Sequence, residues 1–570
     1  MAQFITQKVQ PGPLSRTYNA QLRRSLKQGL ITEIIKKNPA VFRKREKSHK
    51  NVILNRLGWL DVIREMPREL PRIERLVQEV REAGTRHLIV LGMGGSSLCP
   101  EVFYKVFGPQ KWLKSFHVID TTAPSQLEKI LKKVDLTKSF FIVSSKSGTT
   151  IETISQFRFF FRMVKDIRPL KAGNFFAAVT DAGSDLHRMA RRNRFREIFI
   201  NKSDIGGRYS ALSFFGLVPG AFTQADLSDL LSRANTFLDQ MEDADGGNDA
   251  LTLGTLMGCA ATEGIDKLDF RASPKIAPFV MWVEQLVAES TGKEMKGIIP
   301  FEGYTGGTLS ATTKDRLFVQ YALRGDSRAA LYRIPAKGLS APHITIDLND
   351  PHALGVEMLK WEMATVVAST ILGVNPFDEP NVAESKKNTS LILKSRRGHR
   401  KIIPDPPLLK VSDFTINSVS DIQGLKLRQK VSAEDVFEKF VDGIKQGDYL
   451  SILCYTEMTP EIEERLSSLR QALGDRKKAV TMRGYGPRFL HSVGQLHKGG
   501  SRKGHFLVLE RDYQTDFEIP KLNTSFAKLI KAQAEGDIKA LRKRKRPVVN
   551  VNLKTDPIAG LDRILEMVIG

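Results

Sequence analysis

The feature that most constrains this chain is a short apolar run followed by a hydroxyl-rich loop. Ser139–Val143 has the length and apolar character of a buried strand. The next residues, Ser144–Thr153, are rich in serine and threonine and include one lysine and one glycine. When a helix follows such a loop, backbone N–H groups, hydroxyls and an ammonium can all point at one anion. The segment therefore predicts a phosphate-binding loop between a strand and a helix.

Strand-like and helix-like segments alternate through the first half of the chain. Besides Ser139–Val143, we expect strands at His87–Leu91, Ser115–Asp120 and Asn174–Thr180. This alternation predicts an α/β fold with doubly wound parallel sheets. Ligands in such sheets bind at the carboxyl ends of the strands, where the hydroxyl-rich loop and the glycine-rich loop Gly92–Ser97 both lie.

The length of 570 residues exceeds one ordinary core, so several domains are expected. We predict an N-terminal helical segment over 1–80, a first α/β domain over 81–205, a second over 206–403, and a further C-terminal α/β region over 404–570. The basic and then proline-rich segment Lys394–Pro407 has the composition of a linker.

Within the later domains the alternation continues. A long helix is expected at Val280–Glu289 and another at Glu461–Leu473, with strands at Tyr449–Tyr455 and His505–Leu509. The C-terminal region therefore has the same α/β character as the first half.

The charge of the chain indicates anionic partners. The formal net charge is +24, and two dense basic runs occupy Lys386–Lys401 and Lys539–Arg546. Nucleic-acid binding is one interpretation of such runs, but neither run has interleaved aromatic residues. We therefore favour solvated helix ends or linkers, and expect no nucleic-acid partner.

Targeting and metal signals are absent from the sequence. Cys99, Cys259 and Cys454 lie far apart without metal-ligand spacing, so we interpret them as buried thiols in a reducing compartment. Met1–Arg16 lacks the apolar stretch of a signal peptide, and no run of about 18 apolar residues predicts a membrane span. We expect a cytoplasmic protein without metal or other cofactor and without membrane contact.

The glycine-rich loop permits two interpretations. Gly92-x-Gly94-x-x-Ser97 after a strand, with Asp120 ending the next one, partly matches a dinucleotide-binding fingerprint. The sixth position is serine instead of glycine, which weakens that match. A tight turn that exposes N–H groups at a helix N-terminus serves a sugar phosphate equally well.

Three further segments carry charged residues in suggestive places. Arg208 follows two glycines; it is either a surface arginine in a turn or a fixed guanidinium beside a developing oxyanion. Gln285 and Glu289 share one helix face, and Glu289 lies near the helix end, where a general base is one possible role. Lys386, in the first turns of a helix, faces either a pocket or, as its sequence context favours, solvent.

The densest histidine segment is His491–Gly500. His491 and His497 are six residues apart and would not share a helix face well, which argues against a metal site. An acid–base role for one of these two histidines is plausible chemistry near neutral pH.

Taken together, these segments resemble the glucose-6-phosphate isomerase family, which is built from two sugar-isomerase (SIS) α/β domains. Five motifs occur in the family's order: GMGGS at 92–96, SSKSGTTIET at 144–153, GGRYS at 206–210, QLVAESTGK at 285–293 and NPFDEPNVAESK at 375–386. With GPRFLHSVGQLHKGG at 486–500, the chain is most similar to the isomerase half of bacterial transaldolase–isomerase fusions. The resemblance covers roughly residues 50–570.

The resemblance implies a role for each motif residue. The phosphate would be bound by one group of residues that lines a single pocket: Gly94, Gly95, Ser96, Ser145, Lys146, Ser147 and Thr150. Gln285 would support the substrate, and Glu289 would be the base that moves a proton between C1 and C2. Arg208 would stabilise the cis-enediolate, and Lys386 would assist the ring oxygen during opening.

The sequence departs from the family pattern at two places. The segment expected to carry the ring-opening histidine corresponds to Lys314–Phe318, which has no histidine, so we assign that role to His491. Glu379 stands where the family often has glutamine, which adds a negative charge near the site.

The implied reaction is the reversible isomerisation of D-glucose 6-phosphate to D-fructose 6-phosphate, a step of glycolysis and gluconeogenesis that needs no cofactor. The alternatives are an isomerase that also accepts mannose 6-phosphate, and a non-catalytic SIS-type regulator that binds sugar phosphate. The family is commonly oligomeric, so a homo-oligomer, most simply a dimer, is expected.

Overall fold

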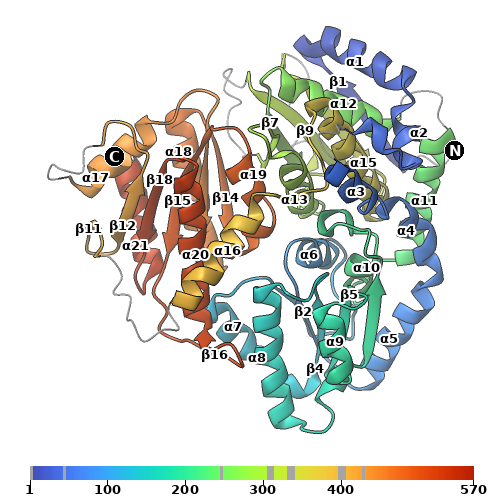
Figure 1. Ribbon diagram of the computed structural model, residues 1–570, viewed down its shortest axis with the longest axis horizontal. Helices are drawn as coiled ribbons and strands as arrows, with labels where there is room; N and C mark the ends of the chain where they lie inside the picture. The colour runs from blue at the N-terminus through green and yellow to red at the C-terminus, as the bar shows by residue number, and fades with distance from the viewer. Residues whose placement is uncertain are drawn as a thin grey trace. The chain divides into compact units, whose positions relative to one another are not determined.

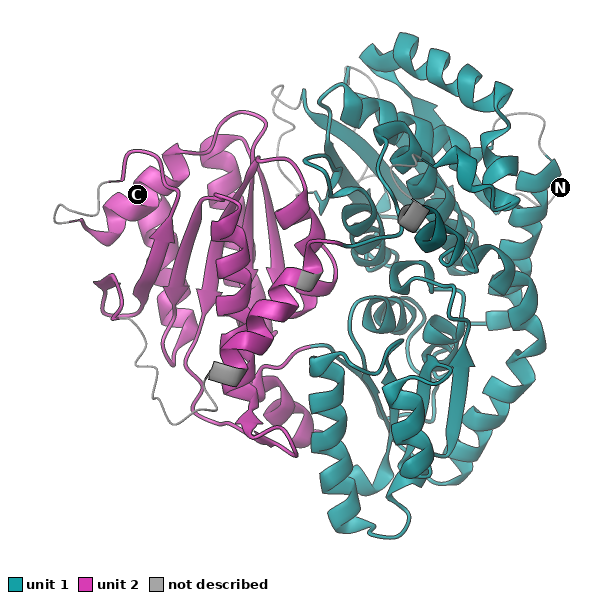
Figure 2. Cartoon of the chain, in the orientation of Figure 1, with its two compact units in different colours: residues 1–120, 134–379 teal, residues 121–133, 380–570 magenta. Residues whose placement is uncertain are grey.

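The protein divides into two compact units, each described by itself. The computed structural model describes residues 4–42, 47–243, 248–303, 314–329, 340–395, 406–425 and 431–569. The first unit comprises residues 1–120 and 134–379, and the second comprises 121–133 and 380–570 (Figure 2). The four-part division predicted from the sequence stays a prediction.

The first sheet of the first unit has five parallel strands in the order β3-β2-β4-β5-β6 (Figure 1). The strands are β2 (His87–Leu91), β3 (Ser115–Ile119), β4 (Ser139–Ser144), β5 (Phe176–Asp181) and β6 (Glu197–Asn201). The parallel α/β sheet predicted from alternation is therefore confirmed, with each of the four expected strands within two residues of its predicted limits. Strands β2 and β4 are buried along their whole length, as their continuous apolar sequences predict.

The second sheet of this unit has the order β1-β10-β9-β7-β8. It contains β7 (Lys267–Ala272), β8 (Ile299–Glu302), β9 (Arg316–Leu323), β10 (His343–Leu348) and β1 (Ile5–Gln10). Strands β7, β8, β9 and β10 are joined in parallel, but β1 pairs antiparallel with β10, Ile5 lying opposite Leu348. The N-terminal segment, expected to be helical, therefore also contains a strand: Ile5–Gln10 completes a sheet whose other strands come much later in the chain.

Helices surround these sheets in the first unit. Those between β1 and β7 in the described residues are α1 (Ser15–Lys27), α2 (Leu30–Ile35), α3 (Lys47–Leu54), α4 (Trp59–Glu65), α5 (Leu70–Glu82), α6 (Gly95–Phe107), α8 (Ile151–Ile167), α9 (Asp185–Arg192), α10 (Phe214–Gly220), α11 (Leu227–Asp243) and α12 (Asp249–Thr262). After β7, the described residues also form α13 (Phe279–Thr291) and α15 (Leu354–Leu372). The helix predicted at Val280–Glu289 is confirmed by α13.

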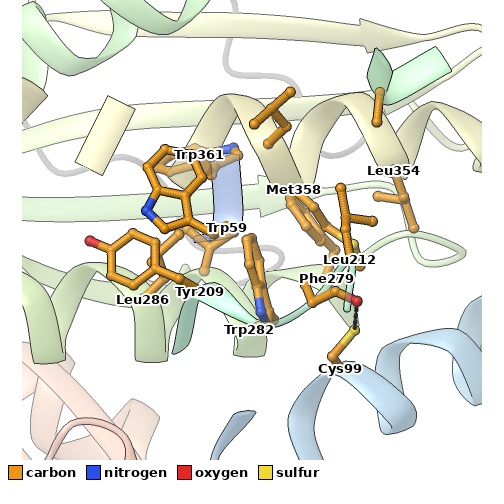
Figure 3. Close-up of a cluster of buried hydrophobic side chains, with 14 of the residues drawn as sticks. Trp59, Cys99, Tyr209, Leu212, Phe279, Trp282, Leu286, Leu354, Met358 and Trp361 are labelled. Atoms are coloured by element: carbon orange, nitrogen blue, oxygen red, sulfur yellow. Dashed lines mark hydrogen bonds between the residues drawn. The ribbon is translucent and has the colours of Figure 1, made fainter. Parts of the chain in front are cut away.

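The core of the first unit is built around large aromatic residues. Trp59, Trp282 and Trp361 are all at most 1% exposed, and they come from three different helices. Figure 3 shows them among leucine, methionine and phenylalanine side chains, with the Cys99 thiol directed at the Ala211 carbonyl. All three cysteines are free and buried, as expected.

The second unit contains a third mainly parallel sheet, in the order β11-β12-β18-β15-β13-β14. Its parallel strands are β13 (Tyr449–Cys454), β14 (Val480–Tyr485), β15 (Gly504–Glu510) and β18 (Val548–Asn552). Strands β12 (Thr415–Ser420) and β11 (Leu409–Lys410) extend one edge in antiparallel fashion, and β16 (Glu518–Ile519) pairs with β17 (Thr524–Ser525) separately. The strands predicted at 449–455 and 505–509 are confirmed.

The helices of the second unit are α7 (Pro124–Leu131), α16 (Val382–Ser395), α17 (Ala433–Asp442), α18 (Pro460–Lys477), α19 (Gly494–Gly499), α20 (Phe526–Lys543) and α21 (Pro557–Ile569). Helix α18 confirms the helix predicted at 461–473. Helix α7 belongs here although it follows β3: Thr122 Oγ1 donates to Gln533 Oε1 at 2.7 Å, and Ser125 Oγ donates to Glu457 Oε2 at 2.9 Å.

The structure describes the second basic run, and it describes the first run only in part. In the second run, Lys543 and Arg544 form ion pairs with Glu384, while Arg546 is buried and donates to the carbonyls of Gly500 and Ser501. Residues 396–401 of the first run, and most of the predicted linker at 394–407, lie outside the described residues. Among the helices of the described ranges, none is long and apolar enough to cross a bilayer.

Candidate active site

Two predicted phosphate-binding loops flank the point where the first sheet changes winding direction. From β2 the chain passes through α6 to β3, which lies on one side of β2. The next strand, β4, pairs with β2 on its other side. Gly94, Gly95 and Ser96 follow β2, whereas Ser145, Lys146, Ser147 and Thr150 follow β4. Because both strands are parallel, the two loops leave the same edge of the sheet, where such folds bind ligands.

The loop after β4 is organised by its own hydroxyls. Ser145 is buried; its Oγ accepts the Gly148 N–H at 3.2 Å and donates to Thr150 Oγ1 at 3.3 Å. Gly148 has φ +69°, and a Cβ there would lie 2.1 Å from the Leu186 nitrogen, so only glycine fits. Ser147 and Thr149 are exposed, with their hydroxyl oxygens 2.7 Å apart. The loop therefore presents hydroxyls on a fixed backbone.

The ammonium group of Lys146 is hydrogen-bonded within the protein. Its Nζ donates to Asp181 Oδ2 at 2.6 Å and to the Ser203 carbonyl at 2.7 Å. Burial raises the pKa of Asp181, and the nearby Lys146 ammonium opposes that rise. A phosphate that recruited Lys146 would therefore compete with the carboxylate of Asp181, a partner that the sequence did not indicate.

Arg208 is buried and fully engaged. It lies in a short 3-10 turn, Gly207–Tyr209, and its Nε donates to Ser290 Oγ at 2.9 Å. Its Nη2 donates to the carbonyls of Pro376 at 2.7 Å and Asp378 at 3.1 Å. These bonds fix the plane of the guanidinium, so the interpretation of Arg208 as a surface residue is wrong.

The carboxylate of Glu289 lies beside this guanidinium. Glu289 is 8% exposed near the end of α13, and its Oε1 is 3.4 Å from Arg208 Nη1. Gln285, one turn earlier, donates from Nε2 to Glu289 Oε2 at 3.2 Å. The structure thus brings together Arg208, Gln285 and Glu289, which the sequence assigned to one reaction. Each oxygen of the Glu289 carboxylate contacts one of the other two residues.

A second carboxylate shares Arg208. Glu379 Oε2 lies 3.2 Å from Arg208 Nη1. Burial acts to lower the pKa of Arg208, but Glu289 and Glu379 outweigh it and raise that pKa. Burial likewise acts to raise the pKa of Glu379, and the charge of Arg208 reverses this, so the net pKa is lowered. The negative charge added by Glu379 is therefore compensated by Arg208.

Lys293 is a buried cation that the sequence reasoning did not single out. Its Nζ donates to the Asn375 carbonyl at 2.6 Å and to Asp378 Oδ1 at 2.8 Å. Burial, reinforced by the charge of Arg208, lowers the pKa of Lys293 to about 8. Lys293 and Arg208 thus bind the same turn, 375–378. The segments 285–293 and 375–386 were both recognised as motifs in the sequence. The contact between them could not be predicted, because it joins residues far apart in the chain.

The glycine-rich loop contacts the turn Gly207–Tyr209, which carries Arg208 and is called the arginine turn below. A Cβ on Gly95 would lie 1.9 Å from the Gly207 carbonyl oxygen, so the first turn of α6 approaches the residue before Arg208 as closely as a backbone allows. The N-terminus of α6, with its partial positive charge, is therefore part of the same site. Gly94, with φ +56°, is the N-cap residue of this helix.

The two remaining predicted residues belong to the second unit. Lys386 is exposed on α16, and His491 is half-buried in the short 3-10 helix Arg488–His491. His497 is instead buried on α19, 3.1 Å from the Tyr449 hydroxyl through Nδ1. Burial, and then the charges of Lys498 and Arg546, lower the pKa of His497 well below its usual value, so it is neutral. The roles of Lys386 and His491 stay predictions.

Within the described ranges, no group of three or more His, Cys, Asp or Glu side chains is arranged to hold a metal ion. The groups that gather at the Arg208 site are a buried carboxylate, buried cations and hydroxyls. They suit proton transfer next to a developing oxyanion.

Comparison with solved structures defines the class of fold. Over 70% of this chain and 90% of the other, the structure superposes on a glucose-6-phosphate isomerase from Chlamydia trachomatis with a TM-score of 0.55 at 18% identity. A hypothetical protein from Thermus thermophilus covers 69% of this chain and all of its own, with a TM-score of 0.54 at 21% identity. The fold is therefore that of the sugar-isomerase α/β proteins.

Sequence comparison gives matches over part of the chain. Residues 37–306 match the family model of phosphoglucose isomerase, so this chain carries a phosphoglucose isomerase domain. A glucose-6-phosphate isomerase from Campylobacter jejuni is 25% identical over 54% of this chain and 85% of its own length. One from Methanocaldococcus jannaschii is 27% identical over 53% and 83%. The resemblance drawn from the motifs is confirmed; the special likeness to transaldolase fusions stays a prediction.

Proposed function

We propose that this chain catalyses the reversible isomerisation of D-glucose 6-phosphate and D-fructose 6-phosphate, with Glu289 as the base. The single observation that carries the proposal is the contact of Glu289 Oε1 with Arg208 Nη1, 3.4 Å apart in a buried site. The relatives named glucose-6-phosphate isomerase support the choice of substrate.

The chemistry follows from this pair. In the open-chain aldose, Glu289 takes the C2 proton, and the electron pair left behind forms the C1–C2 double bond while negative charge develops on O1. Arg208, which Glu289 and Glu379 keep charged against the effect of burial, stabilises that enediolate. The proton of the C2 hydroxyl moves to O1, Glu289 returns its proton to C1, and the ketose forms.

Substrate binding is assigned to the other end of the site. The phosphate would lie on the loop of Ser145, Lys146, Ser147 and Thr150, and the first turn of α6 would add backbone N–H groups. Ring opening precedes the proton transfer and moves a proton from the C1 hydroxyl to the ring oxygen. We assign this step to His491 with Lys386, as the motifs imply.

The test is the Glu289→Gln variant. It keeps the size of the side chain, so it should still bind fructose 6-phosphate in calorimetry. It should lose the exchange of substrate C–H protons with deuterated solvent, followed by NMR, because a base contributes on the order of 10²–10⁴-fold. Glu284→Gln, on the same helix, is the matched control and should exchange as the wild type does.

Two results would contradict the proposal. Exchange by Glu289→Gln at the wild-type rate would remove Glu289 from the role of base. A wild-type protein that binds fructose 6-phosphate but never exchanges or isomerises it would be a sugar-phosphate-binding regulator instead of an enzyme.

A further inference from the structure

Arg56 lies beside the arginine turn although it comes from the N-terminal part of the chain. It follows α3 in a segment that runs along residues 204–206. Leu57 forms an antiparallel bridge with Ile205, and the Gly58 N–H donates to the Asp204 carbonyl at 3.1 Å. A Cβ on Gly206 would lie 3.6 Å from Arg56 Cδ. The side chain of Arg56 therefore lies over Gly206, two residues before Arg208.

The charge of Arg56 reaches both halves of the candidate site. Burial raises the pKa of Asp181, the partner of Lys146 in the phosphate loop, and Arg56 is among the cations that oppose this. Burial also acts to raise the pKa of Glu379, the partner of Arg208, and Arg56 again opposes it. Arg56 is thus within electrostatic range of the loop on one side and of the arginine turn on the other.

Arg56 differs from the other cations of the site in what it binds. Lys146 and Arg208 each contact a carboxylate, as does Lys293. Arg56 is half-buried, and among the described residues its guanidinium forms no ion pair; Nη1 donates to the Asn55 carbonyl at 2.8 Å. Because a guanidinium has five N–H donors, most of those on Arg56 remain for an incoming ligand.

We propose that Arg56 is a further substrate-binding residue, which contacts the phosphate group of the sugar phosphate. The choice of substrate rests on the proposed function, but the location and charge of Arg56 do not. A planar guanidinium matches two phosphate oxygens, and such charge-assisted pairs are stronger than neutral hydrogen bonds. An incoming phosphate reaches Arg56 without displacing a carboxylate, whereas Lys146 must leave Asp181.

The experiment measures binding by calorimetry, with fructose 6-phosphate, inorganic phosphate and unphosphorylated fructose as probes. Arg56→Gln should weaken both phosphate-containing probes about tenfold or more, as expected for loss of a hydrogen bond to a charged group. Binding of fructose should not change. Arg56→Lys, which keeps the charge but loses the planar fork, should lie between Arg56→Gln and the wild type. Arg68→Gln, which removes an exposed arginine that comes later in the same N-terminal part of the chain, is the matched control and should bind as the wild type does.

Kinetics supply a second readout. Arg56→Gln should raise KM about tenfold with kcat within threefold of the wild type, since the contact is made in the ground state and the transition state alike. Undiminished binding of both phosphate-containing probes by Arg56→Gln would overturn the proposal, as would an equal loss for fructose. If the wild type binds fructose 6-phosphate without isomerising it, the proposed function fails while the role of Arg56 is still decided by the binding data.

Discussion

Replacing Lys293 by methionine should change how the stability of the first unit depends on pH. The ordinary pKa of a lysine is 10.5, and in the folded protein burial, together with the charge of Arg208, lowers it to about 8. Between these values the unfolded chain binds a proton that the folded chain does not bind. Stability contributed by this group therefore rises with pH across that window.

The size of the effect follows from the two pKa values. From pH 7 to pH 10 the wild type should gain about 2.5 kcal/mol in free energy of unfolding relative to Lys293→Met, since each unit of pKa difference corresponds to about 1.4 kcal/mol. Other groups that titrate in this range are common to both proteins and cancel in the comparison. The variant loses the contacts to the turn at 375–378 at every pH, so only the pH-dependent part is diagnostic.

The assay can be restricted to the correct unit. All four tryptophans, at positions 59, 112, 282 and 361, belong to the first unit, so tryptophan fluorescence during urea unfolding reports that unit. Lys296→Met is the matched control, because Lys296 is half-buried and donates to the Leu372 carbonyl at 2.6 Å. A wild-type advantage that stays constant or shrinks as the pH rises would refute the reasoning.

Three further substitutions test the site. Gly95→Ala should lower kcat at least about tenfold, because the added Cβ would lie 1.9 Å from the Gly207 carbonyl oxygen. Gly207→Ala is the control and should be tolerated, because its Cβ would meet no atom within 4 Å. Equal losses of kcat in the two variants would contradict this prediction. Arg208→Lys should lower kcat by about 10²–10³ in a coupled assay, because an ammonium cannot reproduce the fork, and retained kcat would exclude Arg208 from enediolate stabilisation. His491→Ala should slow ring-closed substrate far more than open-chain substrate, and equal slowing would reject its role in ring opening.

Much of the fold was predictable because its signals are local. The strands β2 and β4 are continuous apolar runs, and α13 is a long apolar helix that ends at Gly292. Arg208, Gln285 and Glu289 could be predicted as candidate site residues, because each lies in one of the five motifs that occur in the family's order. Their mutual contacts then follow from packing α13 against the arginine turn.

What escaped prediction depends on contacts between distant residues. Strand β1 is a short, mostly polar segment that is stabilised by pairing with β10, and no local pattern announces such a partner. Lys146 contacts Asp181, and Lys293 contacts Asp378 at a sequence separation of 85 residues. A lysine in a predicted phosphate-binding motif can therefore be paired with a carboxylate of its own chain.

The membership of residues 121–133 in the second unit affects synthesis. The hydrogen bond of Ser125 can form only after Glu457, 332 residues later, has been synthesised. The hydrogen bond of Thr122 can form only after Gln533, 411 residues later, has been synthesised. At a translation rate of 5–20 residues per second, the second delay is about 20–80 seconds. During that time the first sheet can form on the ribosome while α7 has no partner. A fragment beginning at residue 380 would lack this helix entirely, so the C-terminal unit is not encoded as one continuous stretch of its gene.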